Sequence, residues 1–103
     1  MGMARRRALT VTADGASNQT GWNSLKKGGV ALLSGTFVAT ATLQRRDGAG
    51  NIQDVTNNSG TVITFNAPGT YTIDPSESQA EYRLNVKSGA FTSGPLLMAI
   101  EGR

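Results

Sequence analysis

The sequence contains neither cysteine nor histidine. Without cysteine, the fold has no disulfide and no thiolate metal site. Without histidine, the chain lacks the commonest general base and the commonest metal ligand. Its seven carboxylates fall mostly in predicted turns, where aspartate hydrogen-bonds the backbone, and no two of them have a spacing that requires a shared site. We therefore expect no catalytic residue, no metal and no cofactor, and we predict that the protein is not an enzyme.

Long apolar segments are also missing. The longest apolar runs are residues 30–33 and 96–100, whereas a membrane helix needs about 20 consecutive apolar residues. The basic N-terminus is not followed by an apolar segment, as it would be in a signal peptide. The sequence therefore predicts no membrane span and no secretion by the usual route.

Positive charge is concentrated near the start of the chain. The 103 residues include 10 basic and 7 acidic ones, and Arg5, Arg6 and Arg7 account for the whole net charge of +3. We predict a flexible basic arm at 1–7 and one folded domain at 8–103. The arm is suited to an acidic protein neighbour. We do not expect nucleic acid as a partner, because the domain has no basic stripe with interleaved aromatic residues.

Alternation of apolar and polar residues is the main structural signal. Residues 36–45 place Phe37, Ala39, Ala41 and Leu43 on one face, and their many threonines disfavour a helix. An Asp-Gly pair at 47–48 predicts a hairpin after this strand. The predicted strands are 8–13, 30–33, 36–45, 52–55, 61–66, 70–73, 81–87 and 96–101, the last of them buried on both faces.

No segment keeps a helical period over three turns, and turn signals recur about every 8–12 residues. The fold class that we predict is all-β. More specifically, we expect a single antiparallel β-sandwich of about eight strands, either jelly-roll or immunoglobulin-like. The sequence does not choose between these two topologies.

Only six aromatic residues are available for a core or a binding surface. Four lie in predicted strands at core positions: Phe37, Phe65, Tyr71 and Tyr82. Trp22 and Phe91 lie in predicted loops, where each is suited to anchor a loop on the core or to anchor an interface. An exposed aromatic ring is also a common platform for a sugar, so a carbohydrate-binding role stays open.

Residues 34–48, Ser-Gly-Thr-Phe-Val-Ala-Thr-Ala-Thr-Leu-Gln-Arg-Arg-Asp-Gly, resemble a pattern of small virion proteins of tailed bacteriophages. In that pattern, a strand of the form G-T-F-x-x-A-T-x-T-L-Q runs into an Asp-Gly hairpin. A Pro-Gly turn (68–69), a Tyr-Arg-Leu strand (82–84) and a Thr-Ser-Gly segment (92–94) follow. The chain departs from it at 51–53, where many such proteins have Thr-Trp.

This resemblance implies a structural protein of the virion, assembled in the host cytoplasm. The leading hypothesis is a capsid decoration (cement) protein that binds the major capsid protein or other virion proteins as a homo-oligomer, with a trimer favoured. The alternatives are a minor tail or head–tail connector component, and a carbohydrate-binding module of a host-recognition structure. The candidate partner-binding residues are Arg5, Arg6, Arg7, Trp22 and Phe91.

Overall fold

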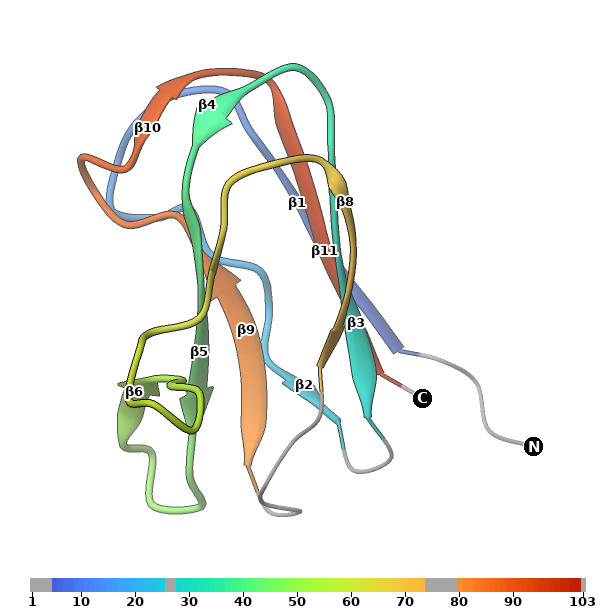
Figure 1. Ribbon diagram of the computed structural model, residues 1–103, viewed down its shortest axis with the longest axis vertical. Helices are drawn as coiled ribbons and strands as arrows, with labels where there is room; N and C mark the ends of the chain where they lie inside the picture. Colours follow the sequence, from blue (N-terminus) through green and yellow to red (C-terminus); the bar gives the residue numbers. More distant parts are fainter. Residues whose placement is uncertain (1–4, 26–27, 74–79, 103) are drawn as a thin grey trace.

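The computed structural model describes residues 5–25, 28–73 and 80–102 (Figure 1). These residues form antiparallel strands and no helix, so the all-β prediction is confirmed. Residues 1–4 of the predicted arm and the predicted loop at 74–79 lie outside this part of the chain. The strands are β1 (Arg5–Val11), β2 (Asn23–Ser24), β3 (Gly29–Ser34), β4 (Val38–Ala39), β5 (Ala41–Arg46), β6 (Ile52–Asp54), β7 (Thr64–Phe65), β8 (Gly69–Ile73), β9 (Glu81–Asn85), β10 (Phe91–Ser93) and β11 (Leu96–Gly102).

The strands form three sheets. One has the order β1-β11-β3-β8, and a second has the order β2-β9-β5-β6 with β7 also paired to β5. The third contains β4 and β10 and lies at the top of the molecule in Figure 1. The two larger sheets face each other (Figure 1). The single sandwich of about eight strands is not confirmed, because the described residues form eleven strands in three sheets.

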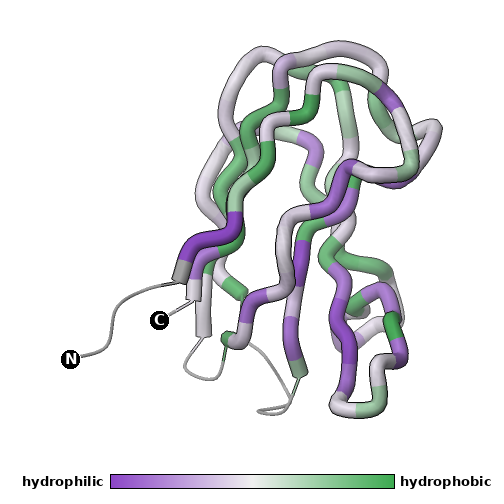
Figure 2. Tube along the Cα trace, turned by 180° about the vertical axis from the view of Figure 1, so that it is seen from behind, coloured by the Kyte–Doolittle hydropathy of each residue, from purple (hydrophilic) through white to green (hydrophobic). Residues whose placement is uncertain are grey.

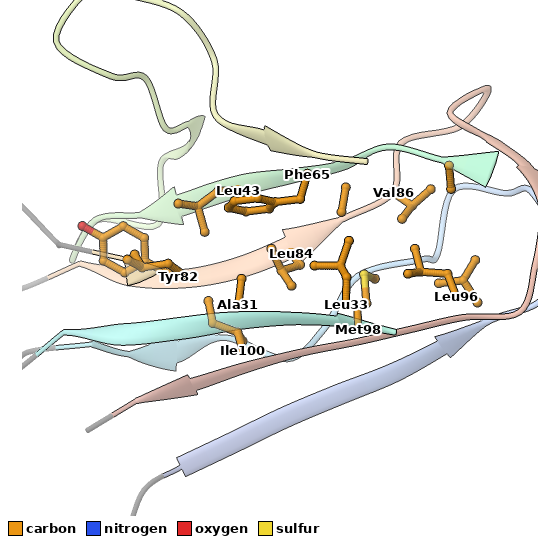
Figure 3. Close-up of a cluster of buried hydrophobic side chains, with 14 of the residues drawn as sticks. Ala31, Leu33, Leu43, Phe65, Tyr82, Leu84, Val86, Leu96, Met98 and Ile100 are labelled. Atoms are coloured by element: carbon orange, nitrogen blue, oxygen red, sulfur yellow. The ribbon is translucent and has the colours of Figure 1, made fainter. Parts of the chain in front are cut away.

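The core fills the space between the two larger sheets. Leu33, Met98 and Ile100 point into it from one sheet, and Leu43 and Leu84 point into it from the other (Figure 3). All of these side chains are buried. They occupy alternate positions of their strands because successive residues of a strand point to opposite faces. The alternation predicted for 81–87 is therefore confirmed. The side chains at the other positions of these strands form an outer face on each of the two larger sheets.

The first strand begins earlier than the sequence predicted. Arg5, Arg6 and Arg7 pair with Gly102, Glu101 and Ile100 of β11. A strand start at Ala8 is therefore wrong, and residues 5–7, which we assigned to the arm, belong to β1. The physical reason is that backbone pairing with an adjacent strand does not depend on the charge of the side chains.

The predicted strand at 36–45 is interrupted at Thr40. The residues before it pair with β10 in the small sheet, and those after it pair with β7 and β9. At the interruption, the N–H of Thr40 donates to the carbonyl of Ala90, 3.0 Å away. Phe91 follows directly and pairs with Ala39. Phe91 therefore lies in a strand and not in the loop that we predicted.

The predicted hairpin at Asp47 is present between β5 and β6. The Asp47 carboxylate accepts hydrogen bonds from the backbone N–H groups of Ala49 and Asn51, at 2.8 and 3.0 Å. These bonds, led by the one from the Asn51 backbone, lower the pKa of Asp47. The turn is thus stabilised by the aspartate that identified it in the sequence.

Candidate binding surfaces

The outer face of the β2-β9-β5-β6 sheet carries a polar network centred on Gln44, which is only 7% exposed. Gln44 Oε1 accepts hydrogen bonds from Arg83 Nε (3.0 Å) and Asn85 Nδ2 (3.1 Å). Gln44 Nε2 donates to Asp54 Oδ1 (2.9 Å), and Lys87 Nζ donates to Asp54 Oδ2 (2.6 Å). These side chains therefore form one connected, ordered polar surface.

Trp22 lies on this face together with two arginines. The guanidinium carbon of Arg46 is 4.7 Å from the centre of the Trp22 ring, and that of Arg83 is 4.4 Å from it. Both distances are within the range of a cation–π interaction. Arg46 also forms an ion pair with Glu81, with an Nη2–Oε1 distance of 2.8 Å. We call Trp22, Gln44, Arg46, Glu81 and Arg83 the Trp22 cluster.

Asp54 makes the stability of the polar network dependent on pH. The hydrogen bond from Lys87, and then the one from Gln44, lower the pKa of Asp54 below its ordinary value of 3.8. Because the folded-state pKa is the lower one, this contribution to stability is present above pH 3.8 and is lost as the pH falls through the folded pKa.

Replacing Asp54 with asparagine should therefore flatten the acid limb of the stability profile. We expect the wild type to lose more unfolding free energy than Asp54→Asn between pH 6 and pH 3, measured by urea denaturation. Equal losses in the two proteins would show that Asp54 does not contribute to the acid sensitivity.

The opposite outer face, on the β1-β11-β3-β8 sheet, is apolar at its centre. Its residues alternate with the core residues of the same strands and meet in register across the sheet. Ala99 lies between Ala8 of β1 and Leu32 of β3, and Leu97 is one step further along β11. We call Ala8, Val30, Leu32, Leu97 and Ala99 the apolar face.

This apolar face is partly open to solvent. Leu97 is 44% exposed, whereas Ala99 is 2% exposed although it does not belong to the core cluster. Neighbouring side chains on the outer side therefore cover Ala99, and a shallow depression of about 100 Å³ lies beside it. The prediction that the last strand is buried on both faces is correct at Ala99 and wrong at Leu97.

A solvated outer face of an antiparallel sheet is normally polar. The outer face of the β2-β9-β5-β6 sheet is polar, as this rule predicts, whereas the apolar face is not. In Figure 2, hydrophobic residues recur along the strands of the β1-β11-β3-β8 sheet, and β1 begins with a hydrophilic segment. Two polar groups border the apolar face: the ion pair of Arg6 with Glu101 at one end and Thr10 with Ser34 at the other.

The predicted partner-binding residues do not form one site. Arg5, Arg6 and Arg7 lie in β1, where Arg6 borders the apolar face and the aliphatic part of Arg7 lies beside Gly21. The side chain of Arg5 is outside the described structure. Trp22 lies on the polar outer face of the β2-β9-β5-β6 sheet, and Phe91 packs against the core from β10. Of the described side chains in this set, only those of Arg6 and Trp22 therefore lie at the two outer faces.

A groove of about 510 Å³ opens between β8 and the β5–β6 region. Its lining combines buried apolar side chains with polar ones, and Asp54 is the only carboxylate in its described lining. Both oxygens of Asp54 already accept hydrogen bonds. Among the residues that the structure describes, the groove therefore has room for a ligand but no pair of acidic groups for acid–base chemistry. Its lining is Leu43, Arg45, Gln53, Asp54, Val55, Thr56, Asn57, Asn58, Ile63, Phe65, Thr72, Ile73 and Tyr82.

Sequence reasoning singled out Trp22 but missed its partners Arg46 and Arg83. The signal for Arg83 was the polar side of the alternating segment 81–87. It forms a site with Arg46 only because β9 pairs with β5. The apolar face was also missed. Its signal was the run at 96–100, which is apolar at every position.

Comparison of the chain with known protein families, curated proteins and solved structures gives no match. In the part of the chain that the structure describes, no helix has the length and hydrophobicity to cross a membrane. Over the same residues, acidic side chains do not gather in groups of three that could hold a metal ion. The outer faces of the two larger sheets are therefore the features from which a function can be inferred.

Proposed function

We propose that this chain is a structural protein of a tailed-bacteriophage particle, and specifically a capsid decoration protein. The observation that carries the proposal is the apolar face, an outer sheet surface with an apolar centre and a polar border. Protein–protein interfaces have the same anatomy, with an apolar core and a polar rim. The resemblance of residues 34–48 to phage virion proteins supplies the choice of partner.

The size of the apolar face is consistent with many weak contacts. Its side chains span three strands that are about 4.8 Å apart and about 14 Å of strand length, an area on the order of 150–200 Å². A stable interface buries about 800 Å² on each partner. One copy would therefore bind weakly, and several linked copies would bind far more tightly. We therefore propose that the protein is a homo-oligomer, specifically a trimer.

In this role the protein acts by mass action. A molecule that binds the assembled head but not its separate subunits shifts the equilibrium toward the assembled state. The proposed partner is the major capsid protein, and the proposed setting is the virion. A minor tail or connector protein is the alternative, and copy number separates the two. Decoration requires hundreds of copies per particle, whereas a connector has tens or fewer.

Replacing Leu97 with glutamate tests the proposal. The substitution places a charge at an exposed position of the apolar face, between Thr10 and Ser34, and burying an unpaired charge is costly. We expect at least a tenfold loss of binding to heads of the phage that encodes this chain, measured by co-sedimentation and quantification of copies per head. Because Leu97 is 44% exposed in the free protein, we expect the fold to persist in circular dichroism.

Val38→Glu is the matched control. Val38 is 60% exposed and lies in β4, away from the apolar face, so the same change should leave head binding within about twofold. Equal binding of Leu97→Glu and the wild type would refute the role of the apolar face. Failure of the wild type to bind heads would refute the proposed function itself.

The carbohydrate-binding alternative is less well supported by the geometry. Its candidate residue, Trp22, already has guanidinium groups over its ring. A sugar would need an aromatic face that is free to stack. Trp22 is better suited to holding the two arginine side chains in place.

A further inference from the structure

Arg83 carries a positive charge that no acidic residue of the described chain neutralises. Its Nε donates to Gln44 Oε1 at 3.0 Å, and its guanidinium carbon lies 4.4 Å from the Trp22 ring centre. No described residue accepts a hydrogen bond from its two terminal amino groups. Those two groups form the edge that binds a carboxylate in a bidentate pair.

The position of this guanidinium group is fixed before any ligand binds. Gln44 is buried and is itself held by Asp54, so the hydrogen bond to Arg83 Nε has a rigid acceptor. The contact with the Trp22 ring restricts the group further. A side chain that is already ordered loses less entropy on binding, which increases affinity.

The surroundings of Arg83 also favour an added negative charge. Partial burial, and then the positive charge of Arg46, lower the pKa of Arg83. Arg46 lies over the same Trp22 ring, and Glu81 is its ion-pair partner. The Trp22 cluster thus holds two guanidinium groups and one carboxylate, and its net charge is positive.

We propose that the Trp22 cluster binds a carboxylate side chain of an acidic segment in a protein partner. Tryptophan and arginine are the residues most enriched at the energetic centres of protein interfaces. Nucleic acid is a poorer fit, because its affinity grows with the number of phosphates neutralised and this cluster has a single unpaired cation. The inference does not depend on the proposed function, since it concerns the opposite sheet and a separate set of residues.

The chain has one tryptophan, so its fluorescence reports on the cluster directly. The probe is a hexaglutamate peptide titrated into the whole protein at low and at physiological salt. We expect a saturable change in Trp22 fluorescence, and a shift of the Trp22 indole N–H signal in NMR. In Arg83→Gln the apparent affinity should fall at least tenfold, and in Arg83→Lys it should fall less, because lysine keeps the charge but not the planar edge.

Arg45→Gln is the matched control. Arg45 is next to Arg46 in β5 but lines the groove on the other side of the strand. The substitution removes the same charge and should change the affinity by less than about twofold. Circular dichroism of each variant checks that it is folded. The proposal is overturned if Arg45→Gln and Arg83→Gln weaken binding equally, if the wild type shows no saturable change, or if oligothymidylate or inorganic phosphate binds more tightly than hexaglutamate.

Discussion

Replacing Leu84 with alanine is expected to lower the free energy of unfolding by about 2–5 kcal/mol. Leu84 is 0% exposed and lies on β9 in the space between the two larger sheets (Figure 3). Its removal loses the transfer free energy of the side chain and leaves a cavity in a closely packed interior. Since a domain of this size is stable by only about 5–15 kcal/mol, the loss is a large part of the total.

Leu97→Ala is the matched control for this measurement. It removes the same atoms from an exposed position on the apolar face, so we expect a loss below about 1 kcal/mol. Urea denaturation of both variants at one protein concentration gives the comparison. Losses of the same size would contradict the exposure of Leu97 and would indicate that the apolar face is covered in the free protein.

Strands whose pattern is local were predictable from the sequence. The alternation of Tyr82 and Leu84 with polar neighbours identified β9, and both side chains are buried as that pattern requires. Asp47 identified the β5–β6 hairpin because its carboxylate binds the backbone of the same turn. In both cases the information lies within a few residues of the element that it determines.

Features that depend on distant segments were not predictable in this way. β1 extends back to Arg5 because β11 offers a partner for its backbone, and nothing near Arg5 in the sequence shows this. The break at Thr40 exists because Ala90, fifty residues later, accepts the Thr40 N–H. Such partners are far apart in the sequence, and they become neighbours only when the chain is folded.

The same distinction applies to the candidate surfaces. Trp22 stands out in the sequence as the only tryptophan, but Arg46 and Arg83 reach it only because β5 and β9 pair in one register. A shift of one residue would move Arg83 to the core side and Leu84 to the outer face. The register of β5 and β9 therefore specifies the polar outer face and the core together.

Replacing Gly35 with alanine is expected to destabilise the protein by more than about 2 kcal/mol. Gly35 follows β3 with a φ of +101°, a conformation that costs a residue with a side chain about 1–2 kcal/mol. A Cβ atom at this position would also lie 2.5 Å from the backbone oxygen of Pro95 and 3.3 Å from Leu97 Cδ1. The backbone would therefore have to move where the chain leaves β3 beside the apolar face.

Two other glycines allow the cost of a positive φ to be measured separately from the cost of atomic overlap at the added Cβ. A Cβ atom added at Gly48 would meet no other atom within 4 Å, and Gly48 has no positive φ, so Gly48→Ala should change stability by less than about 1 kcal/mol. Gly50 has equal space but a φ of +89°, so Gly50→Ala should show the conformational cost alone, about 1–2 kcal/mol. Thermal or urea unfolding of the three variants should rank them Gly48, Gly50, Gly35 in increasing order of destabilisation. If Gly35→Ala loses no more than Gly50→Ala, the close approach of Pro95 does not constrain this turn, and the path from β3 to β4 is set by the left-handed backbone alone.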